Sequence, residues 1–309
     1  MEVNQVKPIH TLGIIVNPRK EQITIHLHKL DNWLRSKKIS VDFLLCSYES
    51  KYAEESYECI QPVTENELLK RSQMIITLGG DGTILKAFQV IGKMEIPILG
   101  INLGGLGFLA DTSPDHMIHN LSSCLDGNYY LENRSVLQCQ VNNNGPTVYA
   151  FNDIVIDKSG FSRVIEIITH VNHSLLNSYI ADGLIISTPT GSTGYSLSAG
   201  GPIVSPQTNV FLINPICPHS LTNRPVIVAD SSVITLKVFT EYKEINIYRD
   251  GQIVNSYPSG TSFQISKADF CVRLVKMKKM SFYDTLRNKL HWGDDFRNKH
   301  RWSLNEKRK

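Results

Sequence analysis

The sequence contains no Cys-x-x-Cys pair and no run of about 18 apolar residues. The six cysteines are scattered, which argues against a zinc site or a disulfide framework and favours free thiols in a reducing compartment. The missing apolar run argues against a transmembrane helix, and the polar segment 1–7 lacks the pattern of a signal peptide. We therefore expect a cytoplasmic protein with no membrane partner.

An excess of charge of one sign is also missing, because the net charge of 309 residues is only +3. With 41% hydrophobic and 20% charged residues, the composition excludes a wholly disordered chain and predicts no nucleic-acid partner. The charge is uneven, however: residues 276–309 hold eleven Lys and Arg against four Asp and Glu. Such a tail is typical of a solvated helix with a frayed end, and contact with an anionic partner is the alternative.

The first third of the chain alternates strand-like and helix-like patterns. Apolar runs predict strands at 12–16, 41–46, 74–78 and 96–101. Helical spacing of apolar residues predicts helices at 21–37, from 65, at 83–91 and at 116–125. Strands separated by helices are typical of a parallel, Rossmann-like α/β sheet, which we assign to a domain of residues 1–128.

The pattern changes near residue 130 to many short strands, as in an all-β sandwich or barrel. These strands are predicted at 136–141, 147–156, 164–171, 178–188, 210–213, 226–228, 233–239, 245–248 and 261–265. We therefore expect a second, sandwich-like domain over 129–279. The segment 280–309 leaves the β pattern, and we expect it to return to the first domain as a helix.

A glycine-rich stretch, Gly79-Gly80-Asp81-Gly82-Thr83, follows one predicted strand and opens a helix. Glycines at a helix start let backbone N–H groups bind an anion. The charge of Asp81 would repel phosphate, but its carboxylate suits a hydroxyl beside the phosphate, as a general base. The alternative is an Asp-Gly turn in which Asp81 only caps the helix.

Two further stretches have unusual composition. Residues 102–108 (Asn-Leu-Gly-Gly-Leu-Gly-Phe) follow the next strand but lack the dinucleotide-binding Gly-x-Gly-x-x-Gly register. Both glycine loops would nevertheless lie at the carboxyl ends of parallel strands, where open α/β sheets bind ligands. Residues 182–198 bring hydroxyl side chains among glycines, and they suit ribose and phosphate, with Tyr195 stacking on a base. The alternative is a polar turn with Tyr195 in the core.

Together these stretches resemble the NAD kinase family. The matching motifs, in chain order, are Gly79–Thr83, Asn102–Ala110, Asn152-Asp153, Asp182–Pro202, Pro218–Leu221 with Arg224-Pro225, and Asp250–Gln252. The resemblance implies an α/β domain, a β-rich domain and a site between them. It also implies a phosphotransferase with an alcohol acceptor, which transfers the γ-phosphate of ATP to the 2′-hydroxyl of the adenosine ribose of NAD. A divalent cation, normally Mg²⁺, would accompany ATP, and homodimers or homotetramers would be usual.

The resemblance assigns roles to matching residues. Asp81 would be the catalytic base, with Gly82 beside it and Lys86 one helical turn further on, within reach of phosphate. The remaining dinucleotide-binding positions would be Asn152, Asp153, Arg163, Asp182, Thr193, Gly194, Tyr195, Ser196, Leu197, Ser198 and Gln252. No resident metal ligand is implied. For Lys86 and Arg163, a plain surface charge is the alternative.

The chain departs from the family pattern at three positions. Asp153 replaces the commoner glutamate and shortens the reach by one methylene, Ile180 replaces an arginine, and Gly194 replaces an alanine. The competing functions are a lipid kinase that shares the glycine-aspartate motif and a dinucleotide-binding regulator without catalysis.

Overall fold

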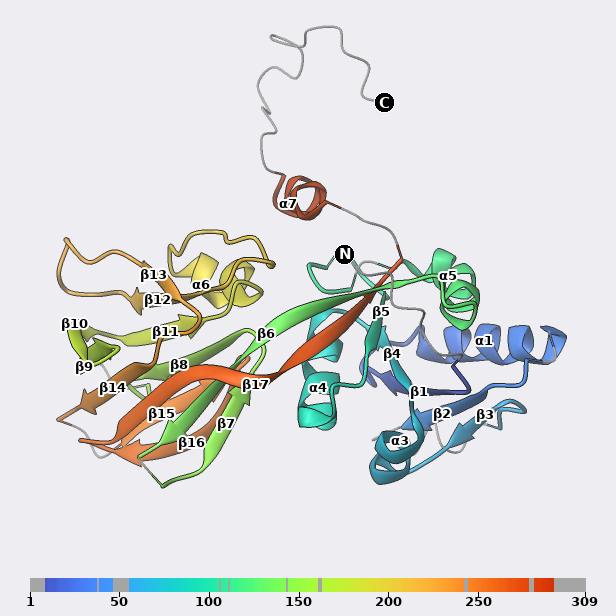
Figure 1. Cartoon of the computed structure of the whole chain (residues 1–309), viewed down its shortest axis with the longest axis horizontal. Helices are drawn as coiled ribbons and strands as arrows, with labels where there is room; N and C mark the ends of the chain where they lie inside the picture. Colours follow the sequence, from blue (N-terminus) through green and yellow to red (C-terminus); the bar gives the residue numbers. More distant parts are fainter. Residues whose placement is uncertain are drawn as a thin grey trace, which may run out of the picture.

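Two sheets and the helices around them make up the protein (Figure 1). The computed structural model describes residues 9–37, 39–46, 56–105, 107–110, 112–142, 144–160, 163–241, 244–277 and 281–291. None of the helices within these ranges combines the length and the apolar character needed to cross a membrane.

The first half is an α/β unit around five parallel strands in the order β3-β2-β1-β4-β5, which confirms the predicted parallel sheet. Its elements are β1 (Thr11–Val16), α1 (Ile23–Lys37), β2 (Asp42–Cys46), β3 (Ile60–Pro62), α3 (Glu65–Arg71), β4 (Met74–Gly79), α4 (Asp81–Ile91), β5 (Ile98–Asn102) and α5 (Met117–Leu125). The sequence analysis missed β3, because three residues ending in proline form no recognisable pattern.

Helices cover both faces of this sheet. Leu27, Leu30 and Leu34 share one face of α1 and pack with α5 against one side of the strands. Ile84 and Phe88 of α4 pack on the other side together with α3. The central strands are therefore buried from both sides, as parallel sheets usually are.

The second half is a sandwich of antiparallel strands, which confirms the predicted β-rich architecture. Its strands are β6 (Tyr130–Val141), β7 (Thr147–Ala150), β8 (Asp153–Asp157), β9 (Ile165–Val171), β10 (Ser174–Ala181), β11 (Gly183–Ser187), β12 (Val210–Ile216), β13 (Val226–Ala229), β14 (Ile234–Phe239), β15 (Glu244–Arg249), β16 (Gln252–Pro258) and β17 (Ser262–Lys276). One sheet has the order β13-β12-β11-β8-β15-β16, and the others belong to the large sheet. Fully buried side chains such as Phe211 and Phe263 fill the space between the two.

Two segments that were predicted as single strands each form two strands, so these predictions were wrong. The segment 147–156 is split into β7 and β8, and the segment 178–188 is split into β10 and β11. In each pair one strand belongs to the large sheet and the other to the smaller sheet, so the chain changes sheets at the break. The apolar pattern continues through the break, because the two strands face the same core from opposite sheets. The sequence therefore does not reveal where the chain passes from one sheet to the other.

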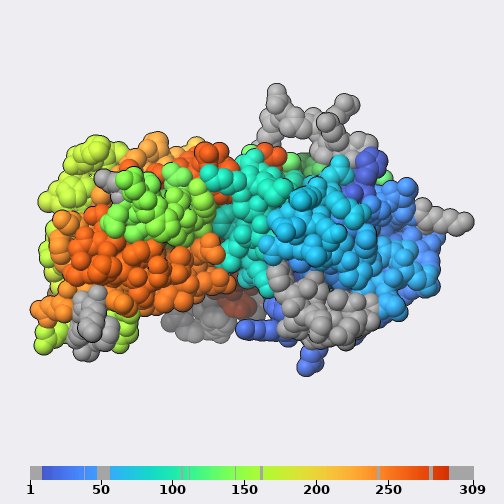
Figure 2. All heavy atoms as spheres, turned by 90° about the horizontal axis from the view of Figure 1, so that it is seen from below, coloured from blue at the N-terminus to red at the C-terminus, as the bar shows by residue number. Residues whose placement is uncertain are grey.

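The strand β17 extends eleven residues beyond its predicted end at 265 and joins the two halves. It pairs with β6 along most of its length, and Leu274 pairs in parallel with Ile98 of β5. The parallel strands and part of the sandwich therefore form one sheet of eleven strands. Figure 2 shows the two halves in contact, with no gap between the cyan atoms and the green and orange atoms. The predicted boundary near residue 128 falls between α5 and β6 and stays a prediction.

The last described helix, α7 (Phe282–Leu290), starts at Ser281, whose Oγ accepts a hydrogen bond from the N–H of Tyr283. Thr285 and Leu286 are its buried residues. Phe282, one helical turn earlier on the same side, lies with its ring 6.4 Å from that of Phe108. The helix thus lies against the second glycine loop. Residues 292–309 of the basic tail lie outside the described residues.

Candidate active site

Both glycine loops lie at the carboxyl ends of neighbouring parallel strands, as the sequence predicts. Gly80 is the N-cap of α4 and Asp81 is its first residue, so the alternative in which Asp81 caps the helix is wrong. The second loop begins at Asn102, the last residue of β5. The N–H of Leu103 donates to the carbonyl of Gly79 at 2.6 Å and ties the loops together.

The carboxylate of Asp81 is held by the backbone of the second loop. It accepts hydrogen bonds from the N–H groups of Phe108 (2.9 Å), Leu109 (3.1 Å) and Ala110 (3.1 Å). A Cβ on Gly107 would lie 2.1 Å from Asp81 Oδ1, so only glycine leaves room for the carboxylate there. This arrangement fixes the position of Asp81 before any substrate binds.

Asn102 shapes the second loop from inside. Its Nδ2 donates to the carbonyl of Gly105 at 2.6 Å, and its Oδ1 accepts from the N–H of Gly104 at 3.0 Å. The asparagine therefore closes a turn that a strand end alone would not make.

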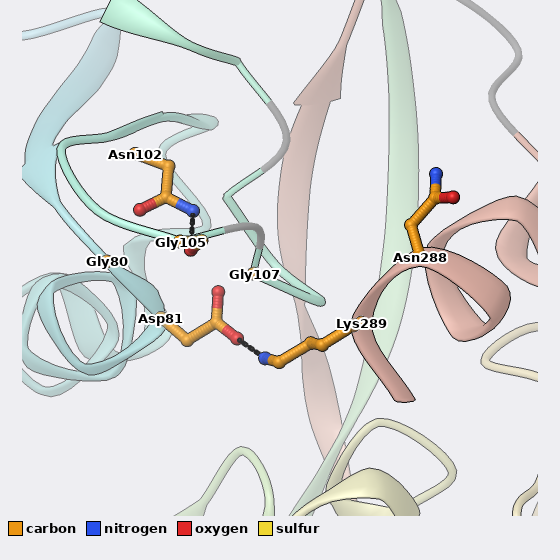
Figure 3. Close-up of a pocket in the computed structure, with 7 residues that line it drawn as sticks. All are labelled: Gly80, Asp81, Asn102, Gly105, Gly107, Asn288 and Lys289. Carbon is orange, nitrogen blue, oxygen red and sulfur yellow. Dashed lines mark hydrogen bonds and ion pairs between the residues drawn. The ribbon is translucent and has the colours of Figure 1, made fainter. Parts of the chain in front are cut away.

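A cavity of about 490 Å³ opens between the loops and α7. It is lined by Gly80, Asp81, Asn102, Gly105, Gly107, Asn288 and Lys289 (Figure 3). The Nζ of Lys289 lies 3.4 Å from Asp81 Oδ2 and 4.3 Å from the centre of the Phe108 ring. The carboxylate of Asp81, the ammonium of Lys289 and the backbone of the glycine loops therefore line the same cavity.

Asp182 marks the start of the third motif, at the break between β10 and β11. Its Oδ1 accepts a hydrogen bond from Lys158 Nζ at 2.6 Å. Tyr195 begins the short helix α6 (Tyr195–Ser198) and is 47% exposed, so the alternative that places it in the core is wrong. Partial burial and the acidic groups around it, including Asp157 and Asp182, raise the pKa of Tyr195.

The other residues of the third motif divide by exposure. Gly194 and Ser198 are exposed, and Thr193 and Leu197 are half-buried. Ser196 is fully buried, and its carbonyl accepts a hydrogen bond from Asn214 Nδ2 at 2.9 Å. Its place in the fold is therefore to anchor α6.

Asp250 organises the turn that carries Asn152 and Asp153. Its carboxylate accepts from the N–H groups of Phe151 (3.0 Å), Asn152 (2.6 Å) and Asp153 (3.2 Å). Asp153 is 4% exposed, and burial together with the nearby Asp250 carboxylate raises the pKa of Asp153 to about 7. Gln252 is exposed at the start of β16, two residues after Asp250.

The remaining predicted residues differ in exposure and in their partners. Gly82 is exposed on the first turn of α4, and Lys86 is half-buried one turn later. Arg163 is exposed and forms an ion pair with Glu241. Ile180 is 40% exposed on β10. The described residues contain no group of three or more His, Cys, Asp or Glu side chains placed to hold a metal ion.

Sequence reasoning assigned no role to several residues that shape the site. Asn102 and Asp250 lie within the quoted motifs, and their asparagine and Asp-Gly turn chemistry is a usable signal. Arg134, 5% exposed on β6, donates from Nη1 to Thr190 Oγ1 at 3.2 Å and pairs with Glu132. Lys289 gives no local signal, because it lies 208 residues from Asp81.

Two family models match the chain. Residues 12–129 match the ATP-NAD kinase N-terminal domain, and residues 151–277 match the ATP-NAD kinase C-terminal domain. Among curated relatives, the NAD kinase of Geobacter sulfurreducens is 41% identical over 237 residues, covering 76% of this chain and 84% of that protein. The NAD kinase of Natranaerobius thermophilus is 38% identical over 290 residues, covering 93% and 100%.

Solved structures resemble the whole fold. A yeast NADH kinase complexed with NADH is 24% identical, with a TM-score of 0.86 over 94% of this chain and 89% of that one. An NAD kinase from Archaeoglobus fulgidus in complex with ATP is 25% identical, with a TM-score of 0.71 over 91% and 98%.

Proposed function

The chain belongs to the NAD kinase family, and we propose that it transfers the γ-phosphate of ATP to the 2′-hydroxyl of the adenosine ribose of NAD. One observation carries the assignment of the chemistry: Asp81 is held by three backbone N–H groups at the edge of a cavity lined by glycines. A fixed carboxylate beside open backbone suits a hydroxyl acceptor next to a phosphoryl donor.

In the proposed reaction Asp81 orients the 2′-hydroxyl. The hydroxyl oxygen forms a bond to the γ-phosphorus while the bond from that phosphorus to the β,γ-bridging oxygen breaks, and ADP leaves. The hydroxyl proton passes to the carboxylate of Asp81 and then to water. Because the transition state of phosphoryl transfer is loose, proton removal comes late and a weak base suffices.

The dinucleotide would lie against the third motif and the turn held by Asp250. The exposed Tyr195 ring offers a stacking surface, and Asp182, fixed by Lys158, offers an acceptor for ribose or amide groups. Asp153, with a pKa near 7, could donate as well as accept hydrogen bonds from its buried position. The other proposed contacts are Gly82, Lys86, Asn152, Arg163, Thr193, Gly194, Leu197, Ser198 and Gln252, and the fully buried Ser196 would support them by anchoring α6.

The proposal also covers the divalent cation, the oligomeric state and the cellular compartment. The divalent cation, Mg²⁺ in the usual case, would enter as part of the Mg-ATP substrate and would meet Asp81, a carboxylate that lines the cavity. We also propose that the chain forms a homodimer or homotetramer, as the family resemblance implies. We propose the cytoplasm as its compartment.

The test is NADP formation by the purified protein from NAD and Mg-ATP, beside the variant Asp81→Asn. We expect wild type to make NADP and the variant to bind NAD normally while kcat falls about 10²–10⁴-fold. A wild type that binds NAD but makes no NADP would refute the proposal and favour the regulator. Phosphorylation of diacylglycerol vesicles in place of NAD would favour the lipid kinase, although the comparisons support neither alternative.

A further inference from the structure

Helix α7 carries one charged side chain into the phosphoryl cavity from the far end of the described chain. Thr285 and Leu286 are buried, and Phe282 packs toward Phe108 of the second glycine loop. Lys289 follows these residues at helical spacing, on the same side of the helix. The docked face therefore holds Lys289 toward Asp81, as Figure 3 shows.

The Lys289 ammonium is held by two contacts and remains open to the cavity. It lies 3.4 Å from Asp81 Oδ2 and 4.3 Å from the centre of the Phe108 ring, and the side chain is 32% exposed. An ammonium has three N–H donors, so donors remain for a further anion. Of the described residues that line the cavity, it is the single cation.

A cation at this point meets a charge that the bound substrate adds. A phosphoryl donor brings several negative oxygens next to Asp81, and like charges this close repel strongly in a partly buried site, beyond what the cation bound to ATP offsets. The N–H groups of Phe108, Leu109 and Ala110 all donate to the carboxylate of Asp81. These three N–H groups therefore stabilise the carboxylate and are not available to the phosphate, which Lys289 is placed to reach.

We propose that Lys289 is a catalytic residue that bridges Asp81 and the transferred phosphoryl group, an inference that rests on the proposed function. Its ammonium offsets the charge of Asp81 when ATP enters and then donates to the γ-phosphoryl oxygens as negative charge shifts during transfer. A fixed cation of this kind stabilises the transition state of phosphoryl transfer more than the bound substrate. The helix α7 thus belongs to the active site.

The test compares Lys289→Met, which keeps the apolar stem, with Arg287→Met on the same helix. Arg287 is half-exposed and pairs with Asp284, so its loss removes the same charge away from the cavity. We expect kcat to fall about 10²-fold for Lys289→Met, whereas Arg287→Met keeps wild-type kcat and both variants keep the wild-type Kd for NAD. Lys289→Arg should recover part of the loss, because a guanidinium also pairs with phosphate.

A second measurement separates charge from structure. In Lys289→Ala, ethylammonium added to the assay should raise kcat in a saturable manner, because the cavity has room for a small cation beside Asp81. The inference is overturned if the kcat of Lys289→Met equals or exceeds that of wild type. A higher kcat would mean that the ion pair between Lys289 and Asp81 inhibits the reaction. The inference is also overturned if neither arginine nor ethylammonium restores activity to a variant with wild-type Tm. An inactive wild type would instead reject the proposed function itself.

Discussion

The close approach of Gly107 to the Asp81 carboxylate allows a sharp test of the active-site geometry. In Gly107→Ala the new Cβ would lie 2.1 Å from Oδ1 and 2.9 Å from Cγ of Asp81. Restoring ordinary contact requires the carboxylate to shift by about 1 Å or more, and a misplacement of about 1 Å can cost 10²-fold in rate. We therefore expect kcat to fall about 10²-fold.

Stability should change less than activity. The shift weakens the hydrogen bonds from the N–H groups to a charged acceptor, so the free energy of unfolding should fall by about 1–3 kcal/mol. Steady-state kinetics of NADP formation and urea denaturation give the two values. The matched control is Gly104→Ala in the same loop, where a Cβ meets nothing closer than 3.6 Å. A kcat for Gly107→Ala within twofold of this control would refute the described placement of Asp81.

Three further predictions concern the second half. Burial and the Asp250 carboxylate raise the pKa of Asp153 from 3.8 to about 7, so the folded chain retains a proton that the unfolded chain loses. The difference in free energy of unfolding between wild type and Asp153→Asn, measured by urea titration, should therefore fall as the pH rises from about 4 to about 7. A difference that does not change with pH would contradict this. Asp182→Asn should raise KM for NAD about tenfold in steady-state assays with little change in kcat, because the contact is made equally in substrate and transition state. Arg134→Met leaves Glu132 without its cationic partner and Thr190 Oγ1 without its donor, so it should lower the free energy of unfolding by about 2–4 kcal/mol in the same titration, where a loss below about 1 kcal/mol would count against it.

Local patterns were sufficient to predict four of the five parallel strands and the glycine loops. Apolar runs at 12–16 and 74–78 are followed by turn residues, and both are strands within one or two residues of the predicted ends. The meeting of the two glycine loops follows from strand direction alone. These features depend on residues that are close in sequence, so the sequence was enough to predict them.

The features that the sequence did not predict depend on distant partners. The strand β17 continues through Lys267, Asp269 and Arg273, charges that interrupt the apolar pattern and that pair with the distant Asp230, Lys93 and Glu95 in the fold. β16 was missed because most of its side chains are exposed, so it lacks the alternation of a half-buried strand. The carboxylate of Asp81 is held by backbone N–H groups 27 to 29 residues further along the chain, and no local sequence pattern predicts such a contact.

The pairing of the last strand with β5 has a consequence for synthesis of the chain. Cys271 donates its N–H to Glu95 across a separation of 176 residues, next to the pairing of Leu274 with Ile98. While a ribosome is still translating the second half, the outer edge of the nascent parallel sheet has no strand to cover it. Contacts of such long range form slowly and leave partly folded chains open to aggregation. A chain truncated before Ser262 would therefore expose the edge of β5, and chaperone binding to the nascent chain should persist until β17 has been made.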